Sequence, residues 1–393
     1  MFEKVREGYV LADAEGQDRA LVLLAERGTF GSEPELGCPE LAEVDAQFQL
    51  PAEEKALLEL DATGRCHDRL LAEGVDLSAY DNPERAADVP AVLQAMGFTQ
   101  WHLWGVSGGA LLAQLLVRDH PQGIKSVMLD SGGFPTAHMA PVGLELLTNT
   151  GARFRRMFDE CAADAACGAA HPDLETRLFA LADALEATPR MVEVTHPFTG
   201  QTREVALDGD LLLQLYTNNM ASVGLLPLVT DMAEAGDWSI VDSVLPAAFV
   251  TDTGTSFSTG LYNSVFCADL GDLSIDEVPT DGVPAALVHA LRPKLETQLQ
   301  ACAAWQVDEV PEGALVGSDT IPALVMEGMY DTNRRPEAGA EVAARFQTAW
   351  LAEYQDRGHV VLDACAVDMM LAFMADPSVP PDMGCVPTAV DWY

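Results

Sequence analysis

The sequence predicts an α/β protein with a mostly parallel sheet, on three observations. Residues 99–130 give a strand, a helix and a second strand, in the arrangement of a right-handed parallel crossover. Residues 321–333 (IPALVMEGMYDTN) give another apolar strand that ends in a turn. With 393 residues the chain exceeds one minimal core, which indicates a large domain with an insertion or two domains.

The first 130 residues predict a series of strands and helices that ends with this strand–helix–strand unit. ALVLLAE (20–26) is a short apolar run that predicts a buried strand, and polar residues around 51–75 have a helical pattern. PERAADVPAVLQAMGF (83–98) predicts a further helix. In the crossover unit, TQWHLWGV (99–106) predicts a strand, GGALLAQLLVRDHP (108–121) a helix that Pro121 ends, and IKSVMLD (124–130) a second strand.

The turn between the first strand and the helix of this unit predicts a catalytic nucleophile, Ser107. It has the pattern G-x-S-x-G, with Gly105 and Gly109 on either side of the serine. A nucleophilic serine at such a strand-to-helix turn needs glycines there, because the backbone is strained and neighbouring chains pass close. The backbone N–H of Gly108 is the oxyanion donor that the turn offers.

This turn predicts an acid and then a histidine further along the chain. Asp331 follows the strand within 321–333, and His359 lies beside a glycine in QDRGHVVLD (355–363). The acid would fix the tautomer of the imidazole, while the histidine takes the serine proton and passes it to the leaving group. We expect no metal and no organic cofactor, because this chemistry needs none.

Other acids and histidines are weaker candidates. Asp130 also ends a strand but lies much closer to the serine in sequence, and Asp356 is too near His359 to reach it from a separate strand. The remaining histidines lie in no comparable loop and are expected to be surface or structural residues: His67, His102, His120, His138, His171, His196 and His289.

The charge of the chain excludes some classes of partner. With 61 acidic and 22 basic residues, the net charge is −39. Such a surface repels nucleic acid and anionic membranes, and no apolar run approaches the roughly 18 residues that span a bilayer. Because like charges destabilise the compact state unless ions screen them, we expect a salty environment; the alternative is an acidic protein that its charge keeps soluble.

The cysteines indicate an oxidising compartment. They form no C-x-x-C pair, so a zinc site has no support, and their even number favours disulfides. The alternative is a cytosolic protein with buried free thiols. The cysteines are Cys38, Cys66, Cys161, Cys167, Cys267, Cys302, Cys365 and Cys385. We expect an extracellular or periplasmic protein; residues 1–20 are acidic and lack the apolar stretch of a signal peptide, which favours a processed, cut or truncated start.

Together the motifs resemble the tripeptidyl-aminopeptidase branch of the α/β-hydrolases, which is related to prolyl aminopeptidases. The resemblance covers nearly the whole chain and rests on LVLLAERGTFGSEPELGCPEL (21–41), GVSGG, CAADAAC, FCADL, CAAW and a closing D…GH…C…C. It implies an α/β-hydrolase core at 1–133 and 319–393 and a mostly helical cap at 134–318. It also implies four disulfides: Cys38–Cys66, Cys161–Cys167, Cys267–Cys302 and Cys365–Cys385.

The chain departs from this family at its N-terminal part. Upstream of residue 20 there is no H-G-G-P-G type loop, which in relatives supplies an oxyanion donor, and the first strands are missing with it. Ala25 and Phe30 replace an aspartate and a glycine, and Gly108 replaces an aromatic residue. An exposed strand edge is an aggregation liability, so we expect a homodimer formed through the N-terminal region.

Three functions follow. With one clear oxyanion donor, an enzyme should keep ester cleavage longer than peptide cleavage, so we favour an esterase that acts on small acyl esters. A secreted exopeptidase that releases short peptides is the alternative; it would need cap carboxylates for the substrate's amine, and Asp269 is a candidate that is better explained as structural. The third is a binding protein or an inactive remnant.

Overall fold

The centre of the fold is a parallel sheet. The computed structural model describes residues 19–393 except 198, 250–257, 272 and 312. The four-stranded sheet has the order β1-β2-β5-β6, and all neighbours are parallel. Its strands are β1 (Trp101–Val106), β2 (Ile124–Asp130), β5 (Ala323–Gly328) and β6 (Ala349–Tyr354). The predicted α/β class is confirmed.

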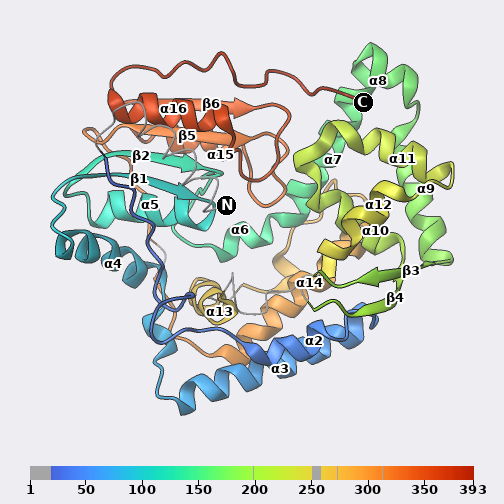
Figure 1. Ribbon diagram of the computed structural model, residues 1–393, viewed down its shortest axis with the longest axis horizontal. Coiled ribbons are helices and arrows are strands. Elements are labelled where there is room, and N and C mark those ends of the chain that lie inside the picture. Colours follow the sequence, from blue (N-terminus) through green and yellow to red (C-terminus); the bar gives the residue numbers. More distant parts are fainter. Residues whose placement is uncertain (1–18, 198, 250–257, 272, 312) are drawn as a thin grey trace.

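Helices cover both faces of this sheet (Figure 1). One face packs against α4 (Asn82–Ala95), α5 (Gly108–Asp119) and α15 (Ala338–Ala343), and the other packs against α16 (Ala364–Ala375). A strand that is buried on both faces has apolar residues throughout, and β5 is buried along its whole length. Apolar runs in the sequence therefore predict the positions of β2 and β5.

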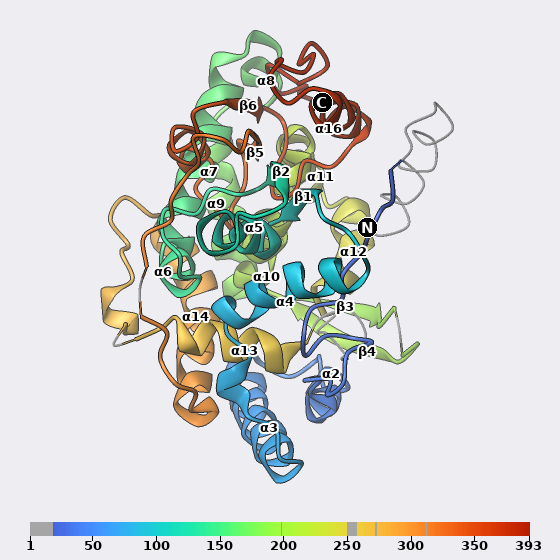
Figure 2. The ribbon, with the colours of Figure 1, turned by 90° about the vertical axis from the view of Figure 1, so that its left-hand side faces the viewer.

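Most helices of the chain come between β2 and β5 in the sequence (Figure 2), and all of these except α13 contribute side chains to one apolar cluster. They are α6 (Ala140–Leu144), α7 (Leu146–Ala163), α8 (Ala165–Ala170), α9 (Leu174–Ala187), α10 (Gly209–Asn218), α11 (Leu226–Glu234), α12 (Ser239–Val244), α13 (Thr259–Ala268) and α14 (Ala285–Trp305). The segment also contains an antiparallel hairpin that the sequence analysis missed, β3 (Arg190–Thr195) and β4 (Thr202–Leu207).

The N-terminal helices lie with these inserted helices and not on the sheet. They are α2 (Ala42–Asp45) and the long α3 (Ala52–Ala72). The buried side chains of α3, among them Cys66 and Leu70, join a cluster with α13 and with Trp305 of α14. Residues before 80 therefore share an apolar cluster with helices that follow residue 258. The division of the chain into a core and a cap at residues 133 and 319 stays a prediction.

The prediction of a strand at residues 20–26 is wrong. The structure has no strand there, although Val22 and Leu24 pack against the sheet cluster that contains α4 and α5. Leu23, which lies between them, is 45% exposed. An apolar run becomes a buried strand only where a neighbouring backbone pairs with it, and β1 pairs with β2 alone among the described residues. The homodimer stays a prediction.

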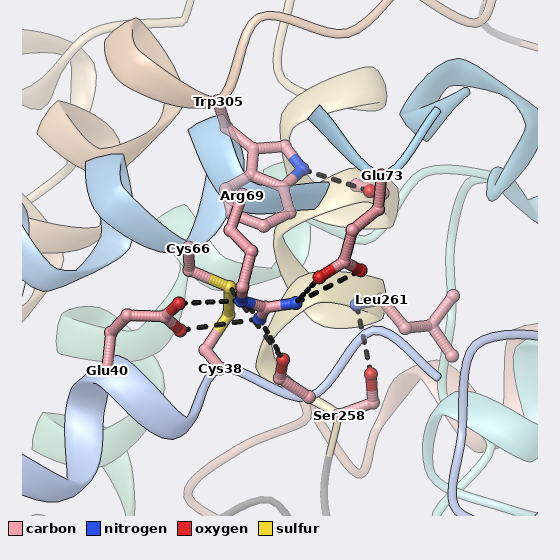
Figure 3. The surroundings of a disulfide bond; sticks show 10 residues. Cys38, Glu40, Cys66, Arg69, Glu73, Ser258, Leu261 and Trp305 are labelled. Atoms are coloured by element: carbon pink, nitrogen blue, oxygen red, sulfur yellow. Dashed lines mark hydrogen bonds and ion pairs between the residues drawn. A yellow bond between two sulfur atoms is a disulfide. The ribbon is translucent and has the colours of Figure 1, made fainter. Parts of the chain in front are cut away.

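All eight cysteines are paired as the resemblance implies. In Figure 3, Cys38–Cys66 joins the segment before α2 to α3, and Arg69 lies beside it, bound to Glu40 and Glu73. The other bridges join α7 to α8, α13 to α14, and α16 to the following segment. Each is expected to stabilise the fold by about 2–4 kcal/mol, mainly by restricting the unfolded chain.

The segment after α16 runs from the sheet to the inserted helices (Figure 1). There the N–H of Tyr393 donates to the carbonyl of Gly224 (3.2 Å), and Nε2 of His171 donates to the carbonyl of Tyr393 (3.1 Å). Val390 and Trp392 pack against the apolar cluster of the inserted helices. Residues 376–393 therefore connect the two parts of the fold a further time.

Candidate active site

Ser107 lies in a strained turn between β1 and α5. Its backbone has φ 53°, a value that residues other than glycine rarely adopt. A Cβ on Gly105 would lie 2.2 Å from the carbonyl oxygen of Gly109, so only glycine allows the helix to approach the strand this closely. The turn is held to the next strand, because the N–H of Ser107 donates to the carbonyl of Asp130 (2.9 Å).

Hydrogen bonds join Ser107 to the two residues that the sequence pairs with it. Nε2 of His359 lies 2.9 Å from Oγ of Ser107, and Nδ1 of His359 lies 2.7 Å from Oδ2 of Asp331. The serine comes from the turn after β1, the aspartate from the loop after β5 and the histidine from the loop after β6. These loops meet because the carboxyl ends of parallel strands lie at one edge of the sheet.

The Asp331 carboxylate is fully buried and accepts three hydrogen bonds. Oδ2 faces the histidine, and Oδ1 accepts from the backbone N–H groups of Asn333 (2.7 Å) and Arg334 (3.0 Å). Asn149 of α7 donates to the carbonyls of residues 331, 332 and 334 at 2.7–3.0 Å. An inserted helix thus fixes the loop of the acid, a role that the sequence analysis did not assign to Asn149.

Two further buried carboxyl groups surround this arrangement. Burial raises the pKa of Asp130, at the end of β2, to about 6. Glu327 of β5 accepts from the N–H of Gly132 (3.0 Å), and its complete burial together with the charges of Asp331 and Asp130 raises its pKa well above the usual range. Like charges this close oppose one another's ionisation, which favours the neutral forms of Asp130 and Glu327.

Gly108 is the first residue of α5, so its backbone N–H has no partner within its own helix. This free N–H at the positive end of the helix dipole is suited to an oxyanion that forms next to Ser107. The structure therefore places the predicted donor at the start of the helix that follows the serine.

The weaker candidates make other contacts. Asp356 forms an ion pair with Arg357, and buried Asp269 accepts from Asn82 (3.2 Å) and from the N–H of Met139 (2.7 Å), which joins α13 to α4. Burial lowers the pKa of His102 to about 4, and its ring bonds Ser126 on β2. These contacts agree with structural roles.

Among the described residues, the one cluster with metal-ligand spacing is Cys38, Glu40 and Cys66. Its two sulfur atoms are bonded to each other, so neither is a thiolate ligand. No helix in the described part of the chain has the length and apolar character of a membrane span.

Comparison with known proteins gives a family match over the C-terminal part of the chain. Residues 289–385, which include β5, β6, Asp331 and His359, match the family model described as TAP-like protein. The C-terminal part of the chain is thus similar to the TAP-like proteins. No curated protein matches the chain.

Several solved structures resemble the chain loosely. They include the α/β hydrolase MGS-M2 from a Medee basin deep-sea metagenome library (12% identity, 76% of this chain and 73% of that chain, TM-score 0.34) and an α/β hydrolase from Novosphingobium aromaticivorans (16%, 76% and 74%, TM-score 0.32). The esterase EaEST from Exiguobacterium antarcticum is similar at 12% identity over 72% and 69%, with TM-score 0.28. At these values the likeness carries no argument about activity.

Proposed function

We propose that this chain is a serine hydrolase that cleaves small carboxylic esters through an acyl-enzyme. One observation carries the proposal: the hydrogen-bonded series from Ser107 through His359 to Asp331. Its order and its distances are those that a serine nucleophile, a general base and an orienting acid require.

In the proposed reaction, Oγ of Ser107 attacks the ester carbonyl while its proton moves to Nε2 of His359. The Gly108 N–H stabilises the negative charge on the carbonyl oxygen, and the Asp331 carboxylate stabilises the imidazolium. The tetrahedral intermediate collapses to an acyl-serine, and the histidine gives its proton to the departing alkoxide. Water then attacks the acyl-serine while the same histidine takes one of its protons. The histidine passes this proton to Oγ of Ser107 as the carboxylic acid is released, which restores the free serine.

The preference for esters follows from the oxyanion donors. Loss of one donor costs roughly 2.7–4 kcal/mol of transition-state stabilisation. An amide depends on that stabilisation and on protonation of its leaving group more than an ester does. Gly108 is the one oxyanion donor that we assign, so we expect the enzyme to cleave esters faster than amides.

The test is a comparison of p-nitrophenyl butyrate with the p-nitroanilide of an N-terminally free tripeptide. We expect turnover of the ester at least about 100-fold above that of the anilide, the size of one lost oxyanion donor. A serine-directed phosphonate should label one site per chain and stop the turnover. Failure of both the label and the turnover would contradict the proposal.

The match to the TAP-like model favours a second candidate, an aminopeptidase that releases short peptides. The same assay decides between them. Release of the tripeptide at a rate comparable to ester turnover would assign the peptidase and would require a second oxyanion donor.

We also propose that the protein acts outside the cell in a salty medium, which its disulfides and its net charge of −39 support. Added salt should screen the repulsion among the carboxylates. We expect the melting temperature to rise by about 5 °C or more between low and molar KCl, measured by calorimetry. A flat or falling curve would contradict the requirement for salt.

A further inference from the structure

The loop that carries His359 is strained at the residue that follows the histidine. Val360 has φ 69°, in the left-handed region that β-branched residues rarely adopt. Such a conformation persists only where surrounding contacts hold it. The contacts that hold Val360 therefore also determine where the imidazole of His359 lies.

Two buried residues at the end of β2 provide these contacts. The N–H of Val360 donates to Oγ of Ser131 (2.9 Å), and the N–H of Val361 donates to Oδ1 of Asp130 (3.0 Å). Asp130 and Ser131 are both 0% exposed. The N–H of Ser131 donates to the carbonyl of Met326 on β5 (2.9 Å), so the sheet itself anchors the pair.

Asp130 also contacts the segment of the nucleophile. Its carbonyl accepts the N–H of Ser107 (2.9 Å), while its carboxylate accepts from the loop of the histidine. One residue thus connects the two segments whose side chains must meet at the Nε2–Oγ hydrogen bond. Oδ2 of Asp130 has no hydrogen-bond partner, so Oδ1 alone makes its contacts.

We propose that Asp130 and Ser131 are positioning residues that hold the His359 loop in its left-handed conformation and thereby align the imidazole with Ser107. The proposal rests on the proposed serine-hydrolase function. Neither side chain contacts the reacting atoms; both act through the backbone of the loop. Without them, Val360 relaxes to an ordinary backbone conformation and the imidazole leaves the serine.

The test compares Ser131→Ala with Ser131→Ala/Val360→Gly, using p-nitrophenyl butyrate as substrate. The single change removes the acceptor for Val360, so we expect kcat to fall about 10-fold to 100-fold with KM nearly unchanged. Glycine adopts positive φ without strain, so the double variant should recover most of the lost kcat.

The carboxylate is tested separately. Asp130→Ala should lower kcat to a similar extent, while Asp130→Asn, which keeps an oxygen at the Oδ1 position, should restore most of it. The carbonyl of residue 130 remains in every variant, so the turn at Ser107 keeps its hydrogen bond. If Asp130→Asn and Asp130→Ala were equally impaired, the negative charge and not the hydrogen bond to Val361 would be the cause, and the positioning role of Asp130 would be rejected.

Ser126→Ala is the matched control, because Ser126 is another fully buried serine of β2 with a side-chain hydrogen bond, to His102. It should leave kcat unchanged. An equal loss in this control, or wild-type kcat in Ser131→Ala, would overturn the proposal.

A second readout separates this proposal from the proposed function. The proton between Nδ1 of His359 and Asp331 gives a low-field NMR resonance when the ring is held in place. We expect the resonance in the wild type and in the double variant but not in Ser131→Ala. If the wild type hydrolyses no ester, the function fails and the resonance still decides the positioning role; if Ser131→Ala keeps the resonance, the positioning role fails.

Discussion

Ser107→Ala is expected to lower kcat/KM for p-nitrophenyl butyrate by about 10⁴-fold or more. The change removes the nucleophile, so no acyl-enzyme forms and only binding and the Gly108 N–H remain to assist water. The side chain of Ser107 contacts His359, whereas the fold depends on its backbone, whose N–H and carbonyl keep their partners. Steady-state rates and loss of phosphonate labelling measure the effect.

The melting temperature of Ser107→Ala should stay close to that of the wild type, since only a partly buried hydroxyl is lost. Ser126→Ala, in the neighbouring strand β2, serves again as the control for loss of a serine hydroxyl. Turnover at the wild-type rate in Ser107→Ala would remove the basis for the whole assignment.

Asp331→Asn is expected to lower kcat by about 10³- to 10⁴-fold. Oδ1 of Asp331 accepts two backbone N–H groups, so the amide oxygen of an asparagine takes that place. Its NH₂ group then faces Nδ1 of His359 as a donor and forces the proton onto Nε2. In that tautomer Nε2 has no lone pair for the serine proton. The measurement is the pre-steady-state rate of acylation, which reports this step directly.

The matched control for this variant is Asp356→Asn. Asp356 lies three residues before His359 but forms an ion pair with Arg357 instead of contacting the imidazole. We expect this change to alter kcat by less than about threefold, as is usual for a partly exposed ion pair. A larger loss in Asp356→Asn than in Asp331→Asn would assign the role of the acid to Asp356.

The local parts of the site were predictable because each has a short-range cause. The turn at Ser107 needs glycines at fixed offsets, and Asp331 follows a strand that is apolar throughout. The pairing of the cysteines came from resemblance alone, since spacing does not choose among the possible pairs. The hairpin of β3 and β4 did leave a signal, the alternation of buried Val192 and Val194 with exposed neighbours.

Other features depend on contacts between distant parts of the chain. ALVLLAE (20–26) looks like a strand, and only the absence of a pairing backbone in the described structure makes it a coil. The hydrogen bond from Val361 to Asp130 crosses 231 positions, and that from Asn149 to Arg334 crosses 185. A local sequence pattern does not identify such distant partners. The sequence therefore indicates Asp130 as an alternative acid and not as a residue that contacts the loop of His359.

The segment after α16 determines how the inserted helices can move. Two covalent connections, after β2 and before β5, join these helices to the sheet. If these two connections were their sole attachments, the inserted helices could rotate about the line that joins the two connections. Besides the hydrogen bonds of Asn149 to the loop after β5, these helices are attached at Gly224 and His171, on the side where α8 and α11 lie (Figure 1). A Cβ on Gly224 would lie 2.1 Å from the carbonyl oxygen of Asp391. We therefore expect these attachments to limit rotation of the inserted helices on the sheet, so that access of a substrate to Ser107 depends on small displacements of loops and side chains.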